Sequence, residues 1–455
     1  MHWDIVFFAI FLAFVSKLKR GFVERNKDRL TGIKVFIDLD NHKNEGEYHS
    51  YYRLLEKGRE LLAEGYTAYS EMSNRRDDTK MIVYTSGTTG VAKGVMLTQR
   101  NIVSGIYYGL QVSTVYSTCL SVLPYHHTYE SVCGILVSLH KHSTICVNEN
   151  LRAVAENLKI YRPDYIMLVP VFVEFLYNMI WKKAEASGKA DQLRALIKTS
   201  NAMRKTGIDL RRTMFKFIHD GFGGRLIKIV CGGAPIRPEL GEFFDSIGIN
   251  LINGYGITEC SPLVSANRDD FSDYNTVGVV LPCFEVAIDD PNENGDGEIL
   301  VKGPAVMKGY YKNPEATSDV MKDGWFCTGD LGRFNSKGQL LITGRKKNLI
   351  VLKNGKNIYP EEIENYLLAA DIIKEVVVYG MKDTSGQETG LLAEIYPDPD
   401  ITKGMDPKSV YALVSEAVKA KLEKLPPYKH IAEIELRDTE FDKTTSKKIK
   451  RDYNR

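Results

Sequence analysis

The residues best suited to do chemistry lie in one short stretch, Tyr84–Val95, which reads YTSGTTGVAKGV. It follows Met81–Val83, an apolar run typical of a buried strand, and combines hydroxyls, glycines and one lysine in a single loop. Glycines let backbone N–H groups approach phosphate oxygens, Ser and Thr hydroxyls add donors, and Lys93 adds a positive charge. A flexible surface loop of small residues is the ordinary alternative. The combination favours a polyphosphate site.

The loop is not the Walker P-loop, because Ala92 and Gly94 stand where that pattern needs Gly and Ser or Thr. It resembles, nearly residue for residue, the signature Y-T-S-G-T-T-G-x-x-K-G-V of the adenylate-forming superfamily of acyl-CoA synthetases, luciferases and peptide-synthetase adenylation domains. Thr98 follows, placed to cap a helix. The resemblance implies that this loop binds ATP through Thr85, Ser86, Gly87, Thr88, Thr89, Gly90 and Lys93.

A second polar group, Leu123–Glu130, reads LPYHHTYE. Adjacent His126 and His127 make a poor metal site, because neighbouring side chains do not converge and no third ligand has the right spacing. In the family this position holds P-x-x-H, whose His lies beside the carboxylate substrate, and the match falls on His127. Amino-acid-activating relatives place an Asp hereabouts. No Asp occurs between Leu123 and Glu149, which argues against an amino-acid substrate.

Two glycine-rich turns follow apolar strands. Residues 226–230 run into CGGAP, and residues 250–252 run into NGYGITE. Ligands of parallel α/β sheets lie outside the carboxyl ends of strands, so both turns should face one crevice. By resemblance the first turn lies along the adenine, the aromatic ring of the second stacks on the base, its Thr touches the α-phosphate and its Glu holds Mg²⁺. These nucleotide-binding residues are Gly233, Ala234, Tyr255, Gly256, Thr258 and Glu259.

Three further phrases complete the resemblance. GWFCTGDLG contains Asp330, which the family uses to accept hydrogen bonds from both ribose hydroxyls. GRKKNLI resembles the interdomain hinge G-R-x-K-D, with Arg345 near the ribose and α-phosphate and Asn348 in place of the usual Asp. Near the end, DKTTSKKIKR resembles P-K-T-x-S-G-K-I-x-R, with Lys447 in place of Gly. Lys448 aligns with the catalytic lysine, although an exposed basic tail would look similar.

The elements that must position these residues form two domains. We expect an α/β fold, with a large multi-subdomain αβ domain over residues 1–344 that has parallel-type sheets and a small antiparallel β-subdomain at 275–345. A smaller, mobile C-terminal α+β domain should cover 345–455. Spacings of three and four residues predict core-facing helix stripes. Their members are Phe172, Phe175, Leu176, Met179 and Ile180, then Ile363, Tyr366, Leu367 and Ala370, and finally Val410, Leu413, Val414 and Ala417.

Composition limits the class of protein. The chain has 455 residues, of which 44% are hydrophobic, and a formal charge of +2, which is typical of an ordinary globular protein and gives no indication of nucleic-acid binding. Its seven cysteines are odd in number and form no C-x-x-C, which fits the cytoplasm and disfavours disulfides or zinc.

Residues 5–15 are apolar throughout. They are about half the ~20 residues that a spanning helix needs, and a membrane-surface anchor is the alternative to a strand. Relatives carry another βα-rich stretch ahead of the matched region, so we expect the chain to enter the large domain part-way. Residues 182–224 are a basic, helix-favouring insertion like those of long-chain fatty acyl-CoA synthetases. It gives weak support for peripheral contact with anionic membrane, and a solvated helical face is the default.

The resemblance as a whole implies a long-chain fatty acid–CoA ligase that uses ATP, Mg²⁺ and CoA. Its catalytic residues would be Lys448, His127, Thr258 and Glu259, with Glu259 as the Mg²⁺ ligand. Two alternatives stay open. One is a nucleotide-binding remnant without turnover, and the other is an aryl- or other acyl-CoA ligase that differs only in its acyl pocket.

Overall fold

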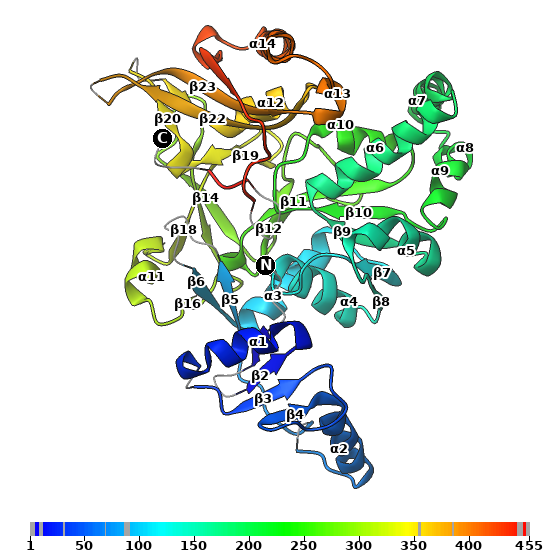
Figure 1. Cartoon of the computed structure of the whole chain (residues 1–455), viewed down its shortest axis with the longest axis vertical. Coiled ribbons are helices and arrows are strands. Elements are labelled where there is room, and N and C mark those ends of the chain that lie inside the picture. Colours follow the sequence, from blue (N-terminus) through cyan, green and yellow to red (C-terminus); the bar gives the residue numbers. More distant parts are fainter. Residues whose placement is uncertain are drawn as a thin grey trace. The chain divides into compact units, whose positions relative to one another are not determined.

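The computed structural model of the chain describes residues 5–8, 12–30, 32–68, 70–85, 92–353, 356–384, 386–443 and 449–451. The chain divides into two compact units, Met1–Arg75 and Arg76–Arg455 (Figure 1). The apolar run at residues 5–15 belongs to the first unit. All the motifs that predict nucleotide binding belong to the second.

In its described residues, the first unit is a four-stranded sheet with two α-helices and a short 3-10 helix, drawn in blue in Figure 1. Its strands are β1 (Ile5–Phe8), β2 (Leu12–Val15), β3 (Val35–Asp38) and β4 (Tyr48–Ser50), and its helices are α1 (Lys17–Arg25) and α2 (Tyr51–Ala63). Strands β1 and β2 are antiparallel, whereas β2, β3 and β4 run parallel. The apolar run therefore contains two strands. Among the described residues, no helix is long and apolar enough to cross a membrane.

The second unit is built on a seven-stranded sheet with the order β13-β12-β11-β10-β9-β7-β8. The strands are β7 (Thr118–Ser121), β8 (Thr144–Val147), β9 (Tyr165–Leu168), β10 (Lys228–Cys231), β11 (Asn250–Gly256), β12 (Leu263–Ala266) and β13 (Val279–Val280). Five neighbouring strands of this sheet, β8, β7, β9, β10 and β11, run parallel. Strand β12 is antiparallel to β11, and β13 is antiparallel to β12. This confirms the predicted parallel-type sheet and places the two glycine-rich turns after β10 and along β11.

Helices surround this sheet (Figure 1). They are α3 (Gln99–Val112), the π-helix η2 (Tyr129–Leu136), α4 (Val137–His140), α5 (Val154–Tyr161), α6 (Pro170–Ala186), α7 (Ala190–Lys205), α8 (Arg211–Met214), α9 (Lys216–Gly221) and α10 (Pro238–Ser246). Residues 182–224 are largely helical, as predicted. The predicted stripe on α6 is partly wrong, because Val173, Leu176, Ile180 and Ala184 are buried while Phe175 is 51% exposed.

The phosphate-loop motif lies on a hairpin, not on the large sheet. Strands β5 (Thr79–Thr85) and β6 (Lys93–Thr98) are antiparallel, and β16 (Gly309–Tyr310) pairs with β6. Of the run Met81–Val83 only Val83 is buried, so the expectation of a buried strand is wrong in part. A hairpin with one covered face buries alternate residues. Thr98 caps α3 in a reciprocal capping box with Asn101, as predicted.

Residues 285–345 form the predicted antiparallel β-subdomain. It contains β14 (Glu285–Asp289), β15 (Gly297–Lys302), β17 (Met321–Lys322), β18 (Trp325–Phe334) and β19 (Leu340–Arg345), with α11 (Pro314–Val320) beside them. Strand β18 pairs with β15, β17 and β19, so Asp330 and Arg345 lie opposite each other on neighbouring strands.

The C-terminal part is a second α+β layer with its own apolar core. It contains β20 (Ile350–Val351), β21 (Asn357–Ile358), α12 (Pro360–Leu367), β22 (Ile373–Lys382), β23 (Glu388–Pro397), α13 (Pro399–Thr402), α14 (Pro407–Leu422) and β24 (Glu433–Leu436). Most of the predicted stripe positions on α12 and α14 are covered. Tyr366 and Leu413 are wrong predictions, since they are 44% and 41% exposed.

Candidate nucleotide-binding and active site

The two ends of the phosphate loop are held together by the hairpin. Thr85 on β5 pairs with Lys93 on β6, and Thr85 Oγ1 lies 3.5 Å from the Lys93 carbonyl oxygen. Ser86, Gly87, Thr88, Thr89 and Gly90, also predicted to bind phosphate, lie outside the described residues. Pairing of the strand ends therefore sets where the loop leaves and rejoins the fold.

Lys93 shares a neighbour with Glu259, although 166 positions separate them in the sequence. Tyr310 is that neighbour: Lys93 Nζ lies 5.0 Å from its ring centroid, and its hydroxyl donates to Glu259 Oε1 at 2.9 Å. The backbone reinforces the contact, since the Met307 N–H donates to the Glu259 carbonyl at 2.7 Å. Burial and the nearby Glu259 charge raise the pKa of Tyr310, so its hydroxyl stays a donor.

Asp330 lies between two donors. The Tyr255 hydroxyl donates to its Oδ2 at 2.6 Å, and Arg345 Nε lies 2.6 Å from its Oδ1. Asp330 is 3% exposed, and Tyr255 is also buried. Burial, followed by the Asp330 charge, raises the pKa of Tyr255 well above its ordinary value. Two predicted ribose-site residues and the predicted adenine-stacking residue therefore form one cluster.

His127 reaches the same region through the residue after it. Thr128 Oγ1 lies 3.5 Å from Thr258 Oγ1, in the turn that carries Glu259. The rings of His126 and His127 are 4.3 Å apart and tilted by 42°. Within the described parts of the chain, no three His, Cys, Asp or Glu side chains gather as metal ligands. All seven cysteines are free, as predicted.

Glycine is required in the two turns for different structural reasons. Gly233 has φ +85°, which a residue with a side chain rarely adopts, and with Ala234 it forms an exposed turn after β10. At Gly256 the constraint is close approach, because a Cβ there would lie 2.2 Å from the Pro262 carbonyl oxygen. The first turn is exposed, and the second is packed tightly against the backbone of Pro262.

The predicted hinge connects β19 to the C-terminal part. The Asn348 side-chain amide donates to Glu361 Oε1 in the first turn of α12. Burial, with the charges of Arg345 and Arg451, lowers the pKa of Lys347 to about 8. Lys447 and Lys448, the candidate catalytic lysines near the end, lie outside the described residues.

Several residues of the site were missed from the sequence. Tyr310 is brought to Glu259 by pairing of β16 with β6, and nothing in the short phrase around it signals that role. Thr128 could have been found, because it follows His127 directly. Lys347 could also have been found, because it is the Lys of the hinge phrase. Its lowered pKa, however, depends on burial.

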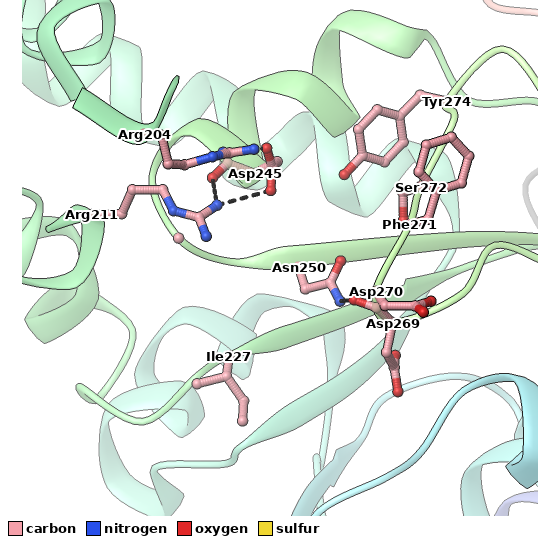
Figure 2. A pocket seen from close by; sticks show the side chains of 11 residues that line it. Arg204, Arg211, Ile227, Asp245, Asn250, Asp269, Asp270, Phe271, Ser272 and Tyr274 are labelled. Carbon is pink, nitrogen blue, oxygen red and sulfur yellow. Dashed lines mark hydrogen bonds and ion pairs between the residues drawn. The ribbon is translucent and has the colours of Figure 1, made fainter. Parts of the chain in front are cut away.

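A separate cavity of about 490 Å³ lies at the opposite ends of the strands (Figure 2). Its lining includes Ile227, just before β10, and Asn250, the first residue of β11. Arg204 and Arg211 point toward Asp245 on α10, with nitrogen–oxygen distances of 2.6 and 2.9 Å. These ion pairs join α7 and α8 to α10, which gives Arg204 and Arg211 a structural role.

Sequence comparison places these features in a known family. Residues 14–311 match the AMP-binding enzyme family, and residues 347–453 match the AMP-binding enzyme C-terminal domain. A chloroplastic long-chain-fatty-acid–[acyl-carrier-protein] ligase of Arabidopsis thaliana is 32% identical over 447 residues, covering 83% of this chain and 59% of the relative. The human long-chain-fatty-acid–CoA ligase 1 is 30% identical over 421 residues, covering 85% and 58%. The chain thus spans little more than half the length of these relatives.

Solved structures agree on the fold. The anthranilate–CoA ligase AuaEII, in complex with anthranoyl-AMP, aligns with a TM-score of 0.72 at 18% identity, covering 96% of this chain and 76% of that chain. The o-succinylbenzoate–CoA synthetase of Bacillus subtilis aligns with a TM-score of 0.67 at 21% identity, covering 94% and 79%. The phosphate-loop hairpin, the Tyr255–Glu259 turn, the Asp330 strand and the hinge all lie within one such fold, and the chain belongs to the AMP-binding enzyme family of adenylate-forming proteins.

Proposed function

We propose that this protein is an AMP-forming acid–thiol ligase that activates a fatty acid with ATP and transfers the acyl group to CoA. The observation that carries the proposal is that segments far apart in sequence converge at the Tyr255–Glu259 turn. Glu259 contacts Tyr310, which lies under Lys93, and Tyr255 contacts Asp330, which pairs with Arg345. Phosphate, metal and ribose functions would then lie side by side.

The Asp330 cluster fits a nucleotide ribose. Its carboxylate already accepts from one donor on each oxygen, the phenol of Tyr255 and the guanidinium of Arg345. The vicinal hydroxyls of a ribose offer the same pair of donors. Ribose would therefore replace existing donors, and Arg345 would become available to the α-phosphate.

In the first step, a carboxylate oxygen of the acid attacks the α-phosphorus of ATP. The bond from that phosphorus to the bridging oxygen of pyrophosphate breaks, which gives acyl-adenylate and pyrophosphate. The protein contributes position and charge, which dominate catalysis of such transfers. We assign Thr258 as a donor to the α-phosphate, His127 to the side of the carboxylate, and Lys93 and Lys448 as the mobile positive charges.

In the second step, the CoA thiol loses its proton to solvent and its sulfur attacks the acyl carbon. The carbon–oxygen bond to AMP breaks, which gives acyl-CoA and AMP. We propose that residues 345–455 move as a domain about the 344–350 hinge between the steps, so that Lys448 serves the first and withdraws for the second. The contact from Asn348 to Glu361 would move with that domain.

Glu259 would hold a magnesium ion in this site. Mg²⁺ is usually bound by one or two carboxylates, with substrate phosphates and water supplying the other ligands, so a single glutamate fits. When bound, the ion supplies positive charge against the phosphates of ATP. The hydrogen bond from Tyr310 orients the Glu259 carboxylate beforehand.

The choice of a fatty acid rests on the relatives and on the absence of an Asp between Leu123 and Glu149. An aryl acid is the competing substrate, because proteins of the same fold include anthranilate and succinylbenzoate ligases. A nucleotide-binding protein without turnover is the competing class. We place the activity in the cytoplasm, where seven free cysteines are expected, with any membrane contact peripheral.

Asp330→Asn tests the ribose assignment directly. The substitution keeps the size of the side chain but removes its charge and one acceptor, so AMP affinity measured by titration calorimetry should fall about tenfold or more. Asp319→Asn is the matched control, because Asp319 is exposed on α11. Unchanged AMP affinity in Asp330→Asn would refute the assignment.

A further inference from the structure

The loop that carries His127 is closed by a buried carboxyl group. Strand β7 ends at Ser121, and Glu130 lies nine residues later in the first turn of η2. Glu130 has no exposed surface, and its Oε1 accepts a hydrogen bond from Ser121 Oγ. A single side chain therefore ties together the two ends of the segment 121–130.

The backbone of this segment is fixed around His127. The His127 N–H donates to the Pro124 carbonyl at 3.1 Å. The His127 carbonyl accepts from the N–H groups of Glu130 and Ser131 at 3.1 and 3.0 Å, and from the Ser131 hydroxyl at 3.1 Å. Because Glu130 takes part in this network through both its backbone and its side chain, displacing it would displace His127.

The surroundings of Glu130 leave room for its carboxyl and little else. A Cβ at Gly134, one turn along η2, would lie 2.9 Å from the Glu130 carboxyl carbon. The other carboxyl oxygen, Oε2, is buried without a hydrogen-bond partner. An apolar side chain of similar size would avoid the cost of burying this group. Ionisable groups held in costly positions cluster at functional sites.

Three uncharged groups interact with Glu130: Cys119 on β7, and Tyr129 and Cys133 on η2. Tyr125 contacts the hydrogen-bond partner of Glu130, with the Tyr125 hydroxyl 3.3 Å from Ser121 Oγ. Burial raises the pKa of Glu130 to about 7, and the Ser121 hydroxyl and Leu123 N–H oppose this shift. The carboxyl therefore changes its charge within the working range of an enzyme.

We propose that Glu130 is a positioning residue for the adenylation step, which holds the 121–130 loop so that His127 faces the reacting carboxylate. The proposal rests on the proposed function, because it takes His127 as the residue beside the acid. It adds a residue that acts through His127 and not on the nucleotide. Substitution of Glu130 should therefore impair the reaction of the acid and leave the binding of ATP unchanged.

Three variants test this role. Glu130→Leu removes the hydrogen bond and keeps bulk, whereas Glu130→Gln keeps an acceptor for Ser121 and cannot ionise. Glu156→Gln is the control, because Glu156 is exposed on α5 of the same sheet domain. In ATP–pyrophosphate exchange with a fatty acid, Glu130→Leu should lower kcat about tenfold or more and raise KM for the acid, with KM for ATP unchanged.

The conservative variant gives a signature that a purely structural role would not. Glu130→Gln should match the wild-type rate below pH 7, where the wild-type carboxyl is protonated, and should lack the wild-type inflection near pH 7. Wild-type constants in Glu130→Leu would overturn the proposal. So would a parallel loss of acid and ATP use with a lower melting temperature, which is the mark of general destabilisation.

Amide hydrogen exchange provides a readout that needs no turnover. The N–H groups of His127, Glu130 and Ser131 should exchange faster in Glu130→Leu than in wild type and in Glu156→Gln. If the wild-type protein shows no ATP–pyrophosphate exchange with any carboxylic acid, the proposed function fails. Amide exchange then decides on the loop alone: faster exchange at these three amides supports Glu130 as its clamp, and unchanged exchange refutes it.

Discussion

Single residues meet at the Tyr255–Glu259 turn, and each brings in a different part of the chain. Thr258 reaches Thr128 beside the histidines, and Glu259 reaches Tyr310 on the strand that pairs with the phosphate-loop hairpin. The motif residues of this turn could be predicted from their resemblance to the family. Tyr310 could not, because its place depends on strand pairing across more than two hundred residues.

At the same scale, Glu130 should make stability depend on pH. Its pKa is raised to about 7 in the folded protein, above the ordinary value of an unfolded glutamate. Between those two values the folded state binds more protons than the unfolded state, so stability should fall as pH rises and level off above about pH 7. Urea midpoints of wild type and Glu130→Gln, measured from about pH 4 to pH 8, isolate this contribution. The urea midpoint should fall more steeply with pH in wild type than in Glu130→Gln. Equal slopes in the two proteins would contradict the raised pKa of Glu130.

Helices and strands position these residues through close backbone contacts. Helix α3 packs against the segment that follows Glu259, and Gly105 is the point of contact. A Cβ at Gly105 would lie 2.6 Å from the Ser261 carbonyl oxygen, whereas one at Gly109, one turn along, would lie 3.8 Å from Leu263. Position 109 therefore has room for a side-chain methyl group, whereas position 105 does not.

Alanine substitutions at these two glycines form a matched pair. Gly105→Ala should destabilise by about 1–3 kcal/mol, because the contact must open. Gly109→Ala should be neutral or stabilise by up to about 1 kcal/mol, because alanine is the better helix former. Thermal unfolding of both variants checks this, and equal effects would show that α3 does not depend on the contact.

The hinge offers a second prediction at this scale. Asn348→Asp would place a second carboxylate beside Glu361, in place of the amide that now donates to Glu361 Oε1. Lost hydrogen bonding and like charge should destabilise the C-terminal part by about 1–2 kcal/mol. In the double variant Asn348→Asp/Glu361→Gln, an amide again faces a carboxylate. Recovery of the melting temperature in the double variant is the expected result, and additive losses would show that the contact does not matter.

The spacing of apolar residues predicted where the helices lie better than it predicted which of their residues are buried. Phe175, Tyr366 and Leu413 each lie beside a buried position of an apolar stripe, yet each is exposed. Spacing identifies the stripe, but which edge is covered depends on the neighbouring element, which a sequence pattern does not contain. The same reason explains Ile82, whose strand has only one covered face in the small hairpin sheet.

At the scale of the whole molecule, we propose that the site is shared by two parts of the chain on either side of residues 344–350. The larger part is proposed to supply Lys93, Glu259 and Asp330, and the C-terminal part to supply Lys448. The motifs occur in family order, and the structure brings their described members into one fold, so the fold class could be predicted from sequence. The identity of the acid could not, because it depends on the shape of a pocket that no motif encodes.

The most direct test of this account is ATP–pyrophosphate exchange by the chain as it exists. Radiolabelled pyrophosphate should enter ATP when a fatty acid and Mg²⁺ are present, and Glu259→Gln should reduce that exchange about tenfold or more by weakening metal-dependent binding of ATP. Glu242→Gln, on α10, is the matched control. Fatty acids should drive exchange more strongly than aryl acids or free amino acids. No exchange with any carboxylic acid, in a protein that still binds ATP, would contradict the account and leave a nucleotide-binding protein without turnover.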